Sequence, residues 1–220
     1  MHAMVRVACA RVMVRDYSLT MTTSSLPMRA RLVQEATRLF ADRGYAATTV
    51  ADIQIACGLT AGSGALYKHF PSKRALLDAV VHQHLDNLTR GAQDVASDPP
   101  SHPRAFLRLV GESVLAAIQR DRDLLRIILR DLDSFPELLE EIWQGVVDHL
   151  YRGLTEWIER ECGDGRVHVD DPAATAAVLL ASLTYYQILD SLIGHTPGGI
   201  ERDRYLDAWV EHAAASLLVT

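Results

Sequence analysis

The sequence predicts an all-α fold of about nine helices, with a small N-terminal helical domain followed by a larger helical body. Apolar residues recur at three- and four-residue spacing along most of the chain, and capping residues open several of these segments. The one candidate strand, 166–169, is too short to form a sheet. At 220 residues, the chain is long enough for a small domain joined to a larger one.

The first two helices are predicted from their apolar faces and their ends. Apolar residues repeat at helical spacing from about Arg29, and Gly44 ends that helix. A second, short helix begins at Thr49, where a hydroxyl followed three residues later by the Asp52 carboxylate forms a capping-box pattern, and it ends at Gly58.

A glycine-rich turn separates the second helix from a third. Three glycines within 58–64 disfavour a helix there, whereas Ala65 to Phe70 suffice for about two helical turns before Pro71. Helix, glycine-bearing turn and short helix over 48–70 form the outline of a DNA-reading helix-turn-helix unit.

The middle of the chain continues as helices. Ser72 caps a longer helix that ends before the proline-containing break at 97–101. Further helices are predicted over 106–118 and 124–132. A longer one is predicted over 134–162, opened by a second capping-box pattern from Ser134 to Glu137.

The last two helices, 172–193 and 202–218, predict self-association. The first is apolar on more sides than one contact face of a monomer can bury, so it needs a second partner. The second carries an apolar stripe suited to packing against a two-fold copy. A homodimer through about 172–218, as a four-helix bundle, is therefore expected. The stripe consists of Leu206, Trp209, Val210, Ala213 and Leu217.

The net charge of −6 conceals an asymmetry along the chain. Residues 1–80 carry ten Lys or Arg and five Asp or Glu, whereas residues 81–220 carry twelve and twenty-three. A basic head on an acidic body suits a protein that binds phosphate locally, although a solvated basic surface explains the charge alone equally well. The acidic body disfavours a membrane-surface protein.

Several other classes of protein are disfavoured. The three cysteines form no CxxC pair, no run of about 18 apolar residues suggests a membrane span, and no signal-peptide core precedes residue 28. These features favour the cytoplasm, with 1–28 a flexible arm or an over-called translation start. Gly62–Gly64 lacks the preceding strand and third glycine of a dinucleotide site, and His82 and His84 are badly spaced for a metal. We expect no enzymatic activity, no cofactor and no metal.

One stretch resembles a known family. Gly44-Tyr45, Thr48-Thr49-Val50, Gly58-Leu59-Thr60 and above all GALYKHFPSK, residues 64–73, are similar to the N-terminal domain of the TetR, or tetracycline-repressor-like, regulators. The resemblance covers 29–80, whereas 81–220 match the family only in size and helicity. It implies a helix-turn-helix domain over 29–75 and a ligand-binding and dimerisation domain over 76–220.

The resemblance also implies roles for individual residues. The short third helix would enter the major groove, and the start of the following helix would touch phosphate. Tyr67 and Lys68 have packing and solvation as alternative roles, whereas Leu66 and Phe70 are expected in the core. The predicted DNA-contacting residues are Thr49, Gln54, Thr60, Ser63, Ala65, Tyr67, Lys68, His69 and Lys73.

Two features depart from the family pattern. The turn from Gly58 to Tyr67 is two residues longer than usual, so that Gly62 or Ser63 caps the third helix. Gln54 stands where a small apolar residue is common, and it is expected to lean toward the DNA.

The helical body is expected to enclose a small-molecule effector, whose identity the sequence does not specify. A plain hydrophobic core is the alternative for each residue of this set. The predicted pocket residues are Phe106, Val110, Arg126, Trp143, His149, Tyr185, Tyr186 and Gln187.

The sequence thus predicts a transcriptional regulator, most simply a repressor, that binds a palindromic operator in double-stranded DNA as a homodimer and is released by a small molecule. The alternative is a helical protein that binds a small molecule or a partner protein without contacting DNA. Salt-dependent DNA binding distinguishes the two.

Overall fold

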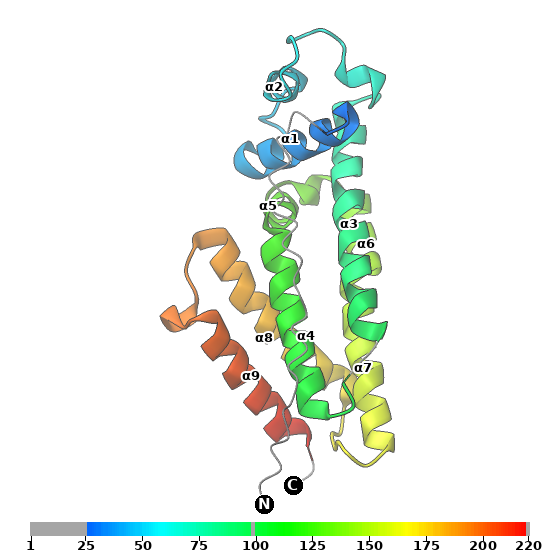
Figure 1. Ribbon diagram of the computed structural model, residues 1–220, viewed down its shortest axis with the longest axis vertical. Helices are drawn as coiled ribbons and strands as arrows, with labels where there is room; N and C mark the ends of the chain where they lie inside the picture. Colours follow the sequence, from blue (N-terminus) through cyan, green and yellow to red (C-terminus); the bar gives the residue numbers. More distant parts are fainter. Residues whose placement is uncertain (1–25, 98–99, 219–220) are drawn as a thin grey trace, which may run out of the picture.

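A computed structural model describes residues 26–97 and 100–218, and this part of the chain is helical apart from one isolated bridge between Val167 and Leu218. The predicted all-α class is confirmed. The molecule is elongated, with α1 and α2 at one end and α3 running from that end along its length (Figure 1). The predicted arm falls largely on residues 1–25, outside the described part, and α1 already begins at Met28.

The N-terminal helices begin and end close to the predicted residues. Gly44 ends α1 in a conformation with φ of +90°, which favours glycine. The capping box at Thr49 is present, and the Ser72 hydroxyl accepts the backbone N–H of Ala75 at 3.0 Å. The elements are α1 (Met28–Arg43), α2 (Val50–Ala56), the 3₁₀ turn η2 (Leu66–Lys68) and α3 (Lys73–Ser97).

The body consists of helices that pack along α3 and α4. Asp171 caps α8 through the N–H of Ala174 at 2.9 Å, as its position before Pro172 predicts. Figure 1 shows α8 and α9 side by side. The elements are α4 (Pro103–Arg120), α5 (Arg122–Asp131), η3 (Leu132–Ser134), α6 (Pro136–Ile142), the π-helical segment η4 (Trp143–Val147), α7 (Asp148–Gly163), α8 (Pro172–Ile193), η5 (Pro197–Gly199) and α9 (Arg202–Leu217).

The prediction of one capped helix over 134–162 is wrong in two respects. The helix begins at Pro136 with Phe135 as its N-cap, and the π-helical segment interrupts it. Glu137 binds Arg74 on α3 instead of completing a capping box with Ser134. Its own backbone N–H, and then Arg74, hold the pKa of the Glu137 carboxyl below its usual value.

The helix-turn-helix head shares its hydrophobic core with the body. Buried residues of α1, α2, η2 and the start of α3 pack with Leu124 and Ile127 of α5 and with Leu138 and Ile142 of α6. The predicted domain boundary at 75/76 lies inside the continuous α3 helix and stays a prediction. Movements of α5 can therefore be transmitted directly to the head.

The apolar stripe of α9 does not face outward as predicted. Its five residues are at most 5% exposed and belong to a second core formed with α4, α7 and α8. The Trp209 indole N–H donates to the Leu179 carbonyl at 3.1 Å, which fixes α9 against α8. The sequence predicts that this stripe contacts a second copy, whereas in the structure it packs on α4 and α8 of the same chain.

The closest approach in this second core gives a stability prediction. A Cβ on Gly111 of α4 would lie 2.5 Å from Leu206 Cδ1 and 3.3 Å from the Trp209 ring. We expect Gly111→Val to lower the free energy of unfolding by about 1–3 kcal/mol through overpacking. A Cβ added to Gly153 of α7 would have no heavy atom of another residue within 4 Å. Gly153→Ala should therefore raise the free energy of unfolding by about 0.5–1 kcal/mol. Urea unfolding of both variants measures these two changes. Equal changes in the free energy of unfolding would contradict the packing of α4 on α9.

Candidate nucleic-acid interface

The segment 60–69 presents polar side chains to solvent from a short anchored element. Leu66 is fully buried and Phe70 is 3% exposed, so these two side chains fix η2 to the core of the head. Tyr67 is 58% exposed, and Lys68 and His69 beside it are exposed as well. The predicted division between core and surface residues is therefore observed in this segment.

The third helix is shorter than the sequence predicts. It is a single 3₁₀ turn, in which the N–H of His69 donates to the Leu66 carbonyl at 2.9 Å. The backbone N–H of Tyr67 donates to Gly64, whose φ is +68°, so the chain before η2 remains a turn. Because this turn continues to Gly64 and η2 begins only at Leu66, one helical turn remains before Pro71.

Gln54 is buried rather than turned toward DNA, which corrects its predicted orientation. Its side chain is 1% exposed, and its Oε1 accepts the backbone N–H of Gly62 at 3.0 Å. Its Nε2 lies 3.4 Å from the Ser63 hydroxyl. A buried amide must satisfy its polar groups, and the lengthened turn supplies the partners. Gln54 therefore positions the turn that carries Ser63.

The unusual residue and the lengthened turn were both visible in the sequence, but as separate departures. An alanine at position 54 could not bond a longer turn, whereas a glutamine reaches it. The co-occurrence of the two departures was the signal that could have placed Gln54 correctly.

Thr49 is exposed at the start of α2, but its hydroxyl is occupied in the structure. The hydroxyl donates to Asp52 Oδ2 at 2.6 Å and accepts the Asp52 backbone N–H at 3.1 Å. Hydrogen bonds from Thr49 hold the pKa of the Asp52 carboxyl below its usual value. A phosphate could receive the Thr49 proton only by displacing this carboxylate, so the predicted donation is not prepared in the structure.

Lys73, at the start of α3, holds the loop between α1 and α2. Its ammonium donates to the carbonyls of Tyr45 at 2.8 Å and Thr48 at 2.9 Å, and lies 4.0 Å from the centre of the Tyr45 ring. Burial lowers the pKa of this ammonium. Two of its three protons are used within the protein, so Lys73 positions the loop in addition to its predicted phosphate contact.

The structure thus divides the nine predicted DNA-contacting residues into two groups. Lys73 and Ala65 are partly buried, and Gln54 is fully buried. The remaining residues are exposed, and all but Thr49 lie in the run 60–69: Thr49, Thr60, Ser63, Tyr67, Lys68 and His69.

The predicted effector residues do not surround one cavity in the described part of the chain. Tyr186 and Gln187 are at most 2% exposed, and the Tyr186 hydroxyl donates to the Ile200 carbonyl at 2.8 Å. Phe106 stacks on Trp157 with ring centres 4.4 Å apart, and Val110 is buried beside it. These four residues are core, as the alternative interpretation held.

Three further members of that set point outward instead. Trp143 and Tyr185 are 54% and 61% exposed, and His149 is exposed on α7. Helical periodicity identifies an apolar face, but the partner of that face depends on neighbouring helices that the pattern does not specify. Arg126 alone of the eight lines a recess that the structure shows.

Comparison with known proteins identifies both halves of the chain. Residues 32–80 match the family described as bacterial regulatory proteins, tetR family, and residues 105–217 match the AefR-like transcriptional repressor C-terminal domain. The second match alone covers more than half of the chain. The chain belongs to the TetR family.

Individual relatives and solved structures agree with this assignment. The chain is 27% identical to the transcriptional regulator TtgR of Pseudomonas putida over 83% of this chain and 88% of that protein. It is 30% identical to the transcriptional repressor KstR2 of Rhodococcus jostii over 58% of this chain and 67% of that protein. A tetR-family structure from Rhodococcus RHA1 superposes with a TM-score of 0.69 and 22% identity, covering 89% of this chain and all of that one.

This TetR-family membership establishes the class of function. The chain is a DNA-binding, ligand-responsive transcriptional regulator and not an enzyme. The exposed segment 60–69 lies within the matched N-terminal range, while α5, α8 and α9 lie within the matched C-terminal range.

Proposed function

We propose that this regulator is a repressor that binds a palindromic operator as a homodimer and leaves it when a small molecule binds the helical body. The observation that carries the proposal is the run 60–69, where exposed Ser63, Tyr67 and Lys68 project from a backbone anchored by buried Leu66. Polar side chains carried by a short rigid element can reach base edges. They read those edges more specifically than side chains on a flexible segment would. The related KstR2 of Rhodococcus jostii is a transcriptional repressor, which supports repression here.

The proposed dimer rests on the exposed face of α8. Positions 174, 178, 181, 185 and 188 are apolar or aromatic and follow one another at alternating four- and three-residue spacing. Val178 is 68% exposed and Tyr185 61%, while α4, α7 and α9 cover the opposite side of the helix. Such a seam suits a second copy of α8 crossing at a shallow angle, with Ala174 and Ala181 allowing close approach.

Two reading segments are needed because η2 is a single turn and spans few base pairs. A two-fold dimer places two such segments on successive major grooves, about 34 Å apart, and requires an operator with matching symmetry. The α8 seam supplies the two-fold contact, and α3 and α5 connect the body to the head.

The proposed location is the cytoplasm, where operator DNA lies. By length and composition α8 could cross a membrane, with a mean hydropathy of 1.4 in its most apolar window. Its contacts with α4, α7 and α9 instead make it a helix of the folded body, and its exposed stripe suits the second copy.

Salt dependence tests the DNA-binding proposal. We expect log affinity for an operator selected from random duplexes to fall linearly with log salt concentration, because bound Lys and Arg side chains release counterions. Lys68→Met should reduce the magnitude of the slope by about two, because each subunit of the proposed dimer would lose one phosphate contact made by its exposed Lys68. Fluorescence anisotropy at several salt concentrations measures both slopes. Affinity that does not change with salt would favour the alternative, a helical binding protein without DNA contact.

A further inference from the structure

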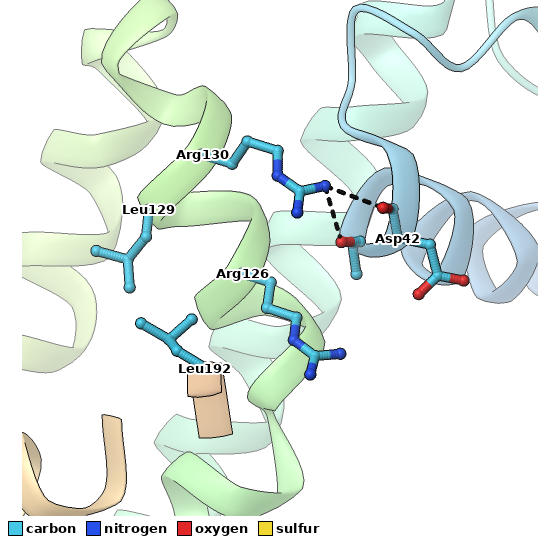
Figure 2. A pocket seen from close by; sticks show the side chains of 6 residues that line it. Asp42, Arg126, Leu129, Arg130 and Leu192 are labelled. Carbon is cyan, nitrogen blue, oxygen red and sulfur yellow. Dashed lines mark hydrogen bonds between the residues drawn. The ribbon is translucent and has the colours of Figure 1, made fainter. Parts of the chain in front are cut away.

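A recess lies where the head meets the body, between the end of α1, the outer face of α5 and the end of α8. Its volume is about 350 Å³, within the range of small-molecule sites. Figure 2 shows Arg126 and Arg130 one above the other on α5 and extending to the same side, with Leu129 of α5 and Leu192 of α8 to their left. The lining residues are Ala41, Asp42, Arg126, Leu129, Arg130 and Leu192.

The recess concentrates positive charge. Arg126 and Arg130 are four residues apart on one helix, a spacing at which like charges repel. No carboxylate among the described residues forms an ion pair with Arg130, and the nearest to Arg126 is that of Asp123 at 3.9 Å. The Asp42 carboxylate pairs with Arg38 of α1 at 3.5 Å. An anion between the two guanidinium groups would offset their repulsion.

The guanidinium groups also have unused donors. Arg126 donates to the Ser191 carbonyl at 3.2 Å, and one nitrogen of Arg130 donates to the carbonyls of Ala41 and Asp42 at 3.2 and 3.1 Å. Each guanidinium has five N–H groups, so both retain donors for a carboxylate or phosphate.

One part of the recess lining is apolar and open to solvent. Leu129 is 56% exposed and Leu192 is 37% exposed, unusual for large aliphatic side chains. Paired cations and exposed leucines in one recess suit a molecule with an acidic group at one end and a hydrocarbon body at the other.

We propose that this recess binds the acidic end of the effector, an amphiphilic anion whose carboxylate or phosphate contacts Arg126 and Arg130 and whose apolar part covers Leu129 and Leu192. The proposal rests on the proposed repressor function and specifies the class of ligand. It places this ligand beside the α8 seam, because Leu192 lies four residues after Ile188, the last position of that seam.

The position of the recess connects ligand binding to the DNA-reading head. Arg130 holds the last carbonyls of α1, and the adjacent Asp131 accepts the backbone N–H of Tyr45 at 3.0 Å. An anion that draws the Arg130 guanidinium away from these carbonyls weakens a polar attachment of α5 to the end of α1. A ligand that binds the displaced arrangement more tightly shifts the protein toward it and repositions the head.

Isothermal titration calorimetry of the full chain with octanoate, octyl phosphate and octan-1-ol tests the site. We expect at least one of the two anions to bind at least tenfold more tightly than the alcohol, and the tighter one identifies the acidic group. Arg126→Gln should weaken anion binding at least tenfold. Arg122→Gln, on the same helix but 62% exposed outside the recess, should leave it unchanged.

The thermal midpoint of each variant confirms that it is folded. Equal binding of alcohol and anions, no binding of either anion, or anion binding that survives Arg126→Gln would overturn the proposal. Operator binding by the same ligand-free preparation is measured in parallel. If the original protein binds the operator but neither anion, only the proposed effector site is contradicted. If the original protein does not bind the operator, the proposed function itself is contradicted.

Discussion

Replacing Val178 by Arg is expected to convert the dimer into a monomer and to lower affinity for a full palindromic operator at least a hundredfold. Val178 is 68% exposed and belongs to the α8 stripe, so the substitution leaves the folded chain intact. In a two-fold interface each copy would bring its arginine into the same seam, where neither charge has a partner. A hundredfold lower operator affinity corresponds to a loss of about 3 kcal/mol in the free energy of operator binding. Analytical ultracentrifugation at micromolar concentration measures the assembly.

The matched control is Leu139→Arg on α6. Leu139 is 42% exposed, so the change also introduces one positive charge at a solvated aliphatic position, but outside the α8 stripe. This variant should remain a dimer with unaltered operator affinity. If both variants dissociate, or if the Val178→Arg monomer still binds the whole palindrome tightly, the two-fold contact lies elsewhere.

The failed prediction for α9 shows what a periodic stripe can specify. The spacing of Leu206, Trp209 and Val210 correctly predicted a helix with one buried face. It could not say whether that face meets a second copy or α4 of the same chain, because both contacts require the same pattern. The apolar excess of 172–193 did predict a second contact face on α8, but it could not specify which residues form that face, since the helix is apolar on its buried side too.

Helix ends were predictable where one side chain determines them. Thr49 and Asp171 are N-caps in the structure, because their oxygens accept a nearby backbone N–H without help from distant residues. Ser134 had the same local pattern, but Arg74, 63 positions from Glu137, binds the carboxylate that the capping box needed. Tertiary contacts decided between two locally reasonable partners.

The sequence predicted which residues of the candidate DNA interface are exposed, but not the hydrogen bonds that position the backbone around them. The motif placed Tyr67, Lys68 and His69 at the surface, where the structure has them. Gln54 instead bonds the turn before this surface, and Lys73 bonds the loop between α1 and α2, although both side chains were expected to reach the DNA. A polar residue near a DNA-reading segment can contact DNA or support the segment, and only three-dimensional neighbours distinguish these roles.

Lys73→Met is expected to lower the free energy of unfolding by roughly 2–3 kcal/mol and to weaken binding to every DNA sequence alike. The variant keeps an aliphatic chain but removes the ammonium bonds to the carbonyls of Tyr45 and Thr48. Thr48 is fully buried, so its carbonyl would gain no ready replacement from water. Chemical denaturation measures the stability, and affinity for a panel of selected and random duplexes measures the sequence dependence.

Lys68→Met is the control for charge, and Tyr67→Phe is the control for sequence reading. Lys68 and Tyr67 are exposed, so both variants should keep the unfolding free energy within about 0.5 kcal/mol of the original. Lys68→Met should weaken all duplexes, whereas Tyr67→Phe should change their order of preference because it removes a donor from the reading segment. A Lys73→Met protein that is as stable as the original would show that its ammonium does not hold the loop before Thr49. If Lys73→Met instead reorders the duplexes as Tyr67→Phe does, Lys73 reads base sequence and the division between positioning and reading residues is wrong.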